Sequence, residues 1–119
     1  VVKTPDGKNH IIDWKTCSWG WDMKKRSDRL VTYQLTLYKN FYSLKYNIDV
    51  SDVETHFALL KRTSKKDKVE IFRVTSGARK MKNALDLLEQ AISNIESKVS
   101  IKNRMSCKYC EFYKTEHCR

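Results

Sequence analysis

The chain has 119 residues, the size of one domain or of a piece of one, and its 40% hydrophobic and 11% aromatic content is enough for a core. No apolar run approaches the roughly 20 residues that span a bilayer, and no signal-peptide pattern opens the chain. We therefore expect a cytoplasmic protein with no membrane partner. The 24 Lys and Arg residues against 14 Asp and Glu give a net charge of +10, which favours nucleic acid as a partner, with a solvated basic surface as the alternative.

The chain opens with a predicted β-hairpin. Residues 1–3 have the character of a strand end, and the turn after them contains Pro5, which presets φ, and Asp6-Gly7, which tolerates a positive φ. Residues 10–16 are the expected returning strand. Because only three residues precede the turn, we expect the chain to be a C-terminal portion of something longer.

The returning strand carries an acid and a lysine on one face. Side chains of a strand alternate with a period of two, so Asp13 and Lys15 share a face with Ile11, while Ile12 and Trp14 share the other. A carboxylate beside an ammonium can hold a divalent cation and stabilise a nearby oxyanion or hydroxide. The alternative is an ordinary half-buried strand with a salt-bridged edge, because short Asp-x-Lys strings are common by chance.

Residues 17–28 form a predicted loop with two tryptophans and a run of three cations. Such a loop can stack its aromatic rings on bases and place its cations against phosphates. The tryptophans can equally cover the edge of a hydrophobic core, and the sequence does not choose between these roles. The candidate nucleic-acid contacts in this loop are Trp19, Trp21, Lys24, Lys25 and Arg26.

Residues 29–46 are a predicted helix. Apolar side chains recur along them at three- and four-residue steps, which is the spacing of one helix face. The predicted buried stripe consists of Leu30, Tyr33, Leu37, Phe41 and Leu44. Gln34 and Tyr38 are four residues apart and therefore lie on one flank of this helix, which we expect Asn47 and Asp49 to end.

A second hairpin and a second helix follow. Residues 53–62 and 69–75 are predicted strands, and we expect His56 on the first of them to be structural or exposed. Ser76 is the expected cap of a helix over residues 77–98. The apolar stripe of that helix is Met81, Leu85, Leu88, Ile92 and Ile95. The order of elements indicates an α/β or α+β fold with a mixed sheet.

Three of the four cysteines fall in the last 13 residues. Clustered cysteines in a cytosolic protein more often bind metal than form disulfides. Zinc held by Cys107, Cys110 and Cys118, with His117 as the fourth ligand, is one interpretation, and reduced thiols in a small apolar plug are another. Cys17 directly follows the acid–lysine strand, so we do not expect it to join them.

Asp13-Trp14-Lys15-Thr16, followed by Gln34 and Tyr38 in a Gln-x3-Tyr pattern and then by the terminal cysteines, resembles the RecB-like branch of the PD-(D/E)XK nuclease superfamily. The resemblance covers nearly the whole chain. It implies an α/β fold in which residues 1–100 are the C-terminal portion of a restriction-endonuclease-like core, a mixed central β-sheet flanked by helices. Residues 101–119 would be a Cys-rich metal-binding segment packed on that core.

The resemblance also implies roles in phosphodiester hydrolysis. Asp13 would bind Mg²⁺ or Mn²⁺, and the backbone carbonyl of Trp14 would reach the same ion. Lys15 would orient the attacking water and stabilise the developing charge. Gln34 and Tyr38 would position the site or touch the DNA strand.

The terminal cysteines resemble the C-terminal part of the iron–sulfur clamp of AddB and of CRISPR adaptation nucleases. Four cysteines hold a [4Fe–4S] cluster in those proteins, and the first of them precedes the nuclease core. We therefore expect the fourth ligand to lie outside this chain. Zn²⁺ is the alternative cofactor for Cys107, Cys110 and Cys118.

The chain departs from the family pattern in its acids. The family's second metal-binding acid lies on the strand before the first hairpin turn, and a helical acid lies further upstream. The first acid of this chain is Asp6, which sits in the turn itself. We therefore expect both acids in an absent N-terminal part, and we expect the 119 residues alone to be a poor nuclease.

The sequence thus predicts a metal-dependent deoxyribonuclease, an exonuclease of DNA recombination, repair or phage DNA metabolism. Its expected partners are DNA and a helicase or recombination protein. The first alternative is a non-catalytic nucleic-acid-binding module, stabilised by zinc, that works through residues 17–28. A structural subunit of a larger assembly is the other alternative.

Overall fold

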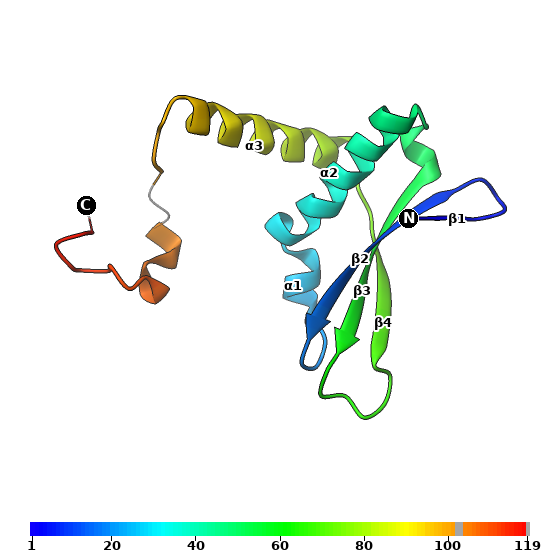
Figure 1. Ribbon diagram of the computed structural model, residues 1–119, viewed down its shortest axis with the longest axis horizontal. Coiled ribbons are helices and arrows are strands. Elements are labelled where there is room, and N and C mark those ends of the chain that lie inside the picture. The colour runs from blue at the N-terminus through cyan, green and yellow to red at the C-terminus, as the bar shows by residue number, and fades with distance from the viewer. Residues whose placement is uncertain (102–103, 119) are drawn as a thin grey trace. The chain divides into compact units, whose positions relative to one another are not determined.

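The computed structural model describes residues 1–101 and 104–118 and divides into two compact units, residues 1–88 and 89–119, which are taken separately below. The predicted Cys-rich segment therefore includes three residues, 102, 103 and 119, that lie outside the described part. The first unit contains a four-stranded sheet in the order β1-β2-β3-β4, together with helices α1 and α2 and the first part of α3 (Figure 1).

The sheet is mixed. Its strands are β1 (Val2–Lys3), β2 (Asn9–Cys17), β3 (Val53–Lys61) and β4 (Val69–Val74). β2 runs parallel to β3, and the two outer pairs are antiparallel. Parallel neighbours need a crossover connection, and helix α2 (Arg29–Tyr46) supplies it. The predicted α/β, restriction-endonuclease-like arrangement with a mixed sheet flanked by helices is confirmed.

Both ends of α2 follow from capping residues. The Asp28 carboxylate accepts hydrogen bonds from the backbone N–H groups of Leu30 and Val31, at 2.8 and 3.3 Å, which satisfies two donors of the first turn. Asn47 ends the helix in the left-handed conformation, with φ of 51°. The predicted end of this helix at Asn47 is confirmed.

The buried face of α2 differs from the predicted stripe. Leu35 is completely buried, whereas Leu30 and Leu44 are 66% and 71% exposed. Two of the buried positions beside Leu35 are threonines, Thr32 and Thr36, which an apolar pattern does not register. The Thr36 hydroxyl lies 3.1 Å from the Thr32 carbonyl oxygen, to which it donates, so the helix itself satisfies this buried group.

The core of the first unit is a small cluster of side chains from α2, β3, β4 and the segment before α1. It consists of Trp21, Leu35, Phe57, Leu59 and Val74. Trp21 belongs to the predicted loop of residues 17–28, which in fact contains a short helix, α1 (Met23–Ser27). Its ring centroid lies 5.1 Å from that of Phe57, so the assignment of Trp21 as a nucleic-acid contact is corrected to that of a core residue.

The last helix, α3 (Ala78–Glu96), begins in the first unit and ends in the second. Ala84 is its only buried residue in the described part of the chain, and Ile92 and Ile95 of the predicted stripe are exposed. Single 3₁₀ helices cover Val50–Asp52 and Arg104–Tyr109. None of the helices in the described ranges is long and apolar enough to cross a membrane.

Stability measurements can distinguish the observed buried face of α2, which contains Leu35, from the predicted one, which contains Leu30. Leu35→Ala leaves a cavity in the core, so we expect it to lower the free energy of unfolding by about 2–5 kcal/mol in urea titrations. Leu30→Ala, on the same helix and with the same chemical change, should alter it by less than about 0.5 kcal/mol because Leu30 is exposed. Equal losses in the two variants would contradict the observed orientation of α2.

Candidate active site

Asp13 and Lys15 of β2 form a close ion pair on the face of the sheet that α2 covers. Asp13 Oδ2 lies 3.0 Å from Lys15 Nζ, and the two side chains are 17% and 33% exposed. Their register partners on β3 are Phe57 and Leu59, which are completely buried. Lys15 Nζ also lies 5.9 Å from the centroid of the Phe57 ring. The pair therefore lies against buried apolar side chains, where the interaction between charges is stronger than in water.

Gln34 and Tyr38 of α2 extend the pair into a continuous polar chain. Lys15 Nζ donates a hydrogen bond of 3.0 Å to Gln34 Oε1, and Gln34 Nε2 donates one of 2.8 Å to the Tyr38 hydroxyl. Tyr38 is 44% exposed, so the chain runs from a partly buried carboxylate to a residue in contact with solvent. The four residues selected from the sequence are thus brought together in one place.

The Asp13 carboxylate suits a hard divalent cation. Its Oδ2 atom is buried and accepts no hydrogen bond from the described residues, although the Lys15 ammonium makes an ion pair with it. A buried oxygen without a hydrogen bond is costly in a protein, and it is the kind of ligand that Mg²⁺ and Mn²⁺ prefer. Among the described residues, Asp13 does not belong to a group of three or more carboxylate, imidazole or thiol ligands.

The candidate nucleic-acid contacts of residues 17–28 divide into two groups. Trp19 is 76% exposed, and Lys24 is also exposed. Arg26, in contrast, donates through Nε to the Trp21 carbonyl oxygen at 2.8 Å and forms an ion pair with Glu70. The hydrogen bond from Arg26 lowers the pKa of the Glu70 carboxyl, as expected for a partner that prefers the ionised form. Arg26 thus makes structural contacts, and its role as a nucleic-acid contact stays a prediction.

Lys25 is between these groups, because its Nζ lies 4.8 Å from the ring centroid of Trp21. The contact is a cation–π interaction at the edge of the core, and it covers a face of the buried indole. Lys25 itself is exposed, so its ammonium remains accessible to a phosphate.

A basic hollow that the sequence did not indicate lies where α2 and α3 begin. Its volume is about 580 Å³, and its lining includes Arg29, Arg79, Lys80 and Tyr33, the residue directly before Gln34. Lys80 Nζ donates to the Thr75 carbonyl oxygen at 3.1 Å, and burial lowers the pKa of this ammonium. Cations from two helices were not recognised in the sequence because they become neighbours only when the helices pack.

The terminal cysteines belong to the second unit. Cys107 lies in the 3₁₀ helix, and Cys110 follows it, with a hydrogen bond of 3.2 Å from the Cys110 N–H to the Cys107 carbonyl oxygen. No disulfide links cysteines in the described part of the chain. Within the same part, Cys107, Cys110, Cys118 and His117 are not gathered into one group of potential ligands. A cluster or zinc site here therefore stays a prediction.

An Asp-x-Lys strand under a helix that bears glutamine and tyrosine, on a mixed sheet with a parallel crossover, is the arrangement that the resemblance to nucleases predicts. A comparison with known protein families matches residues 1–115 to the PD-(D/E)XK nuclease superfamily, and the chain belongs to this superfamily. Its members are nucleases that generally use Mg²⁺ or Mn²⁺. Comparisons with curated proteins and with solved structures gave no match.

The two tryptophans of residues 17–28 should respond differently to substitution. Trp21→Ala leaves a large cavity in the core, so we expect a loss of about 3–5 kcal/mol in the free energy of unfolding. Trp21→Phe should cost less, partly because it removes an indole N–H that is buried without a hydrogen-bond partner among the described residues. Trp19→Ala should leave stability within about 0.5 kcal/mol. Urea unfolding measures all three variants, and a large loss for Trp19→Ala would contradict its exposed position.

Proposed function

We propose that this chain acts in a metal-dependent deoxyribonuclease that hydrolyses the phosphodiester bonds of DNA. The observation that supports this proposal best is the polar chain itself: Lys15 Nζ lies 3.0 Å from Asp13 Oδ2 and 3.0 Å from Gln34 Oε1, beside the buried Phe57. A carboxylate and an ammonium held together on an apolar surface can bind a cation and stabilise developing negative charge.

Each residue of the polar chain has a distinct role in the proposal. Asp13 holds Mg²⁺ or Mn²⁺, and the Trp14 carbonyl is a further ligand to the same ion. When bound, the ion polarises the phosphate and lowers the pKa of a water molecule. Lys15 orients the attacking water and stabilises the negative charge that develops on the phosphate oxygens.

Gln34 is a positioning residue in this scheme. Its Oε1 accepts a hydrogen bond from Lys15 Nζ at 3.0 Å, so it helps to fix the position of the ammonium. The Tyr38 hydroxyl accepts a hydrogen bond from Gln34 Nε2. Tyr38 is also half-exposed, which suits contact with a DNA strand.

The surface charge fits DNA as the substrate. The net charge is +10, and the basic hollow of Arg29, Arg79 and Lys80 lies on α2 and α3 beside the residue that precedes Gln34. Trp19, Lys24 and Lys25 provide a second set of exposed groups for bases and phosphates. The Gln-x3-Tyr pattern supports a place in the RecB-like branch, hence a cytoplasmic exonuclease of DNA recombination, repair or phage DNA metabolism with a helicase or recombination partner.

The terminal Cys107, Cys110 and Cys118 hold a [4Fe–4S] cluster in the proposal, with Zn²⁺ as the alternative. The family resemblance supports the cluster. A fourth ligand is required in either case, from His117 for zinc or from a cysteine outside this chain for the cluster.

The catalytic assignment can be tested in the full-length protein that contains these residues. We expect Asp13→Asn and Lys15→Met each to lower Mg²⁺-dependent cleavage of DNA by about 10²–10³-fold, the usual cost of losing a group that stabilises developing charge. Asp67→Asn is the matched control, since this exposed carboxylate lies in the β3–β4 loop and its left-handed φ of 50° suits asparagine. Titration with Mn²⁺, followed by electron paramagnetic resonance, should show weaker binding only in Asp13→Asn.

Unchanged cleavage in both site variants would refute the assignment of Asp13 and Lys15. A full-length protein that binds DNA in a salt-dependent manner and never cleaves it would favour the non-catalytic nucleic-acid-binding module instead. The exposed Trp19 and the basic hollow are compatible with that second function.

Anaerobic purification of the full-length protein distinguishes the two cofactors of the cysteine segment. We expect a broad visible absorbance that bleaches on reduction, together with iron in elemental analysis, because a [4Fe–4S] cluster is coloured and zinc is not. Cys107→Ser and Cys110→Ser should remove the absorbance, whereas Cys17→Ser, on β2, should not. Zinc without iron would overturn the cluster and leave the alternative.

A further inference from the structure

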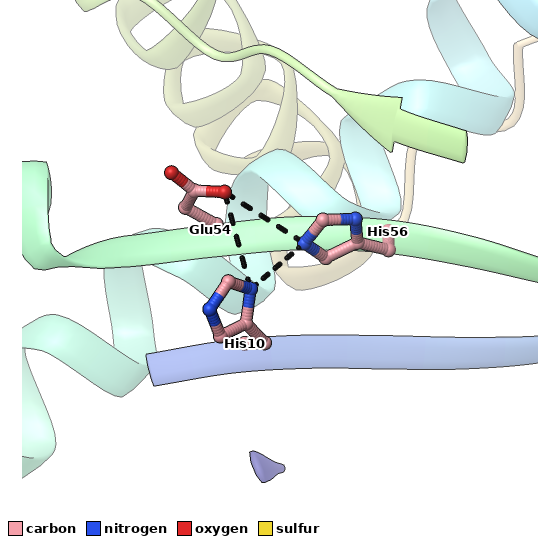
Figure 2. A group of neighbouring side chains, drawn as sticks. All are labelled: His10, Glu54 and His56. Carbon is pink, nitrogen blue, oxygen red and sulfur yellow. Dashed lines mark hydrogen bonds and ion pairs between the residues drawn. The ribbon is translucent and has the colours of Figure 1, made fainter. Parts of the chain in front are cut away.

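A second group of potential metal ligands lies on the other face of the sheet. His10 of β2 pairs in register with Glu54 of β3, and His56 is two residues further along β3, so the three side chains project from neighbouring strands to the same face (Figure 2). His10 is three residues before Asp13 on β2, so alternation places it on the face opposite to the polar chain of Asp13 and Lys15.

The three ligand atoms form a compact triangle. His10 Nδ1 lies 3.1 Å from His56 Nε2, and Glu54 Oε2 lies 3.9 Å from each of these nitrogens. A point equidistant from the three atoms is about 2.1 Å from each of them, within the roughly 2.0–2.2 Å range of zinc bonds to nitrogen and oxygen. All three side chains are partly buried.

We propose that His10, Glu54 and His56 form a binding site for a transition-metal cation of the zinc class. Two imidazoles and one carboxylate are a recurrent zinc set, with the fourth position left to water. Imidazole ligands also separate this site from that of Asp13, because Mg²⁺ prefers oxygen ligands. The inference does not rest on the proposed nuclease function.

A chain of hydrogen bonds from the first turn prepares His10 for this role. The Thr4 hydroxyl donates to the Asp6 carboxylate, so its oxygen remains an acceptor, and it lies 3.3 Å from His10 Nε2. An Nε2–H donated to Thr4 leaves the lone pair on Nδ1, the nitrogen that faces His56 and Glu54. Metal-binding histidines in proteins are commonly fixed by such a partner on the second ring nitrogen.

The surrounding charges fix the carboxylate and also limit the affinity. Lys8 and Arg73 both approach Glu54 Oε1, at 3.0 and 3.2 Å, which leaves Oε2 for the imidazoles. The Lys8 hydrogen bond lowers the pKa of Glu54, and burial lowers the pKa of His56, so both groups favour the form that binds a metal. The same two cations repel a divalent ion, so removing one of them should tighten binding.

The test uses the 119-residue chain with Cys107, Cys110 and Cys118 replaced by serine, so that thiols do not compete for the metal. Isothermal titration with Zn²⁺ should show one site, which His10→Ala and His56→Ala each weaken at least tenfold. Asp67→Asn, an exposed carboxylate of the β3–β4 loop outside both groups, should leave the affinity unchanged. Arg73→Gln should strengthen it. Affinities that His10→Ala and His56→Ala do not change would overturn the site.

A second measurement keeps His10, Glu54 and His56 intact, so its result does not depend on whether a substituted variant folds. Cu²⁺ bound to the same chain, in which the three terminal cysteines are replaced, should show two coordinated imidazoles by pulsed electron paramagnetic resonance, because His10 and His56 both present a ring nitrogen. Fewer than two imidazoles would overturn the proposal. Nuclease assays of the full-length protein with Mg²⁺ report separately on Asp13, so failure of one proposal is distinguishable from failure of the other.

Discussion

The parallel pairing of β2 with β3 is the constraint on which the rest of this structure depends. It is in register from Asn9 to Cys17, so each residue of β2 has a fixed neighbour on β3. On one face it seats Asp13 beside the buried Phe57, and on the other it sets His10 beside Glu54. A slip of one residue would exchange the two faces and dismantle both groups at once.

Lys15 links the sheet to the crossover helix α2 in the candidate site. Its ammonium makes two contacts of 3.0 Å, one to Asp13 on its own strand and one to Gln34 on α2. A partly buried ion pair contributes little net stability because the charges lose their water, so packing elsewhere must fix α2. The buried Leu35 and the 2.8 Å contact between the Thr36 and Ser76 hydroxyls hold the helix in the required orientation.

Local patterns in the sequence predict the elements and the polar chain, because both depend on spacing along one strand or one helix. Asp13 and Lys15 are two apart on a strand, and Gln34 and Tyr38 are four apart on a helix. The buried face of α2 was predicted only in part: Tyr33 is buried as expected, but Thr32 and Thr36, whose side chains count as polar, occupy the rest of that face. Their hydroxyls have acceptors within the fold, and hydrophobic periodicity does not register them.

What the sequence could not predict depends on contacts between distant segments. Trp19 and Trp21 are the same residue type at nearby positions. Trp21 is the buried one because its ring packs against Phe57 and Phe72, which lie far away in the sequence. His10 and His56 are 46 residues apart, and their ring nitrogens meet at 3.1 Å because two strands pair in parallel. Glu54 and His56 are two residues apart, which is the spacing of one face of a strand. Without His10 beside them, this spacing is only a weak indication of a metal site.

The two faces of β2 therefore carry different chemistry on one backbone. The face under α2 offers a carboxylate oxygen and an ammonium against buried apolar side chains, which suits a hard cation and an anionic substrate. The opposite face offers two imidazoles and a carboxylate that is already shared with Lys8 and Arg73. A metal bound there would join β2 to β3 only three residues before Asp13. It would thus reinforce the strand pair that positions the ion pair, without competing for the same ion.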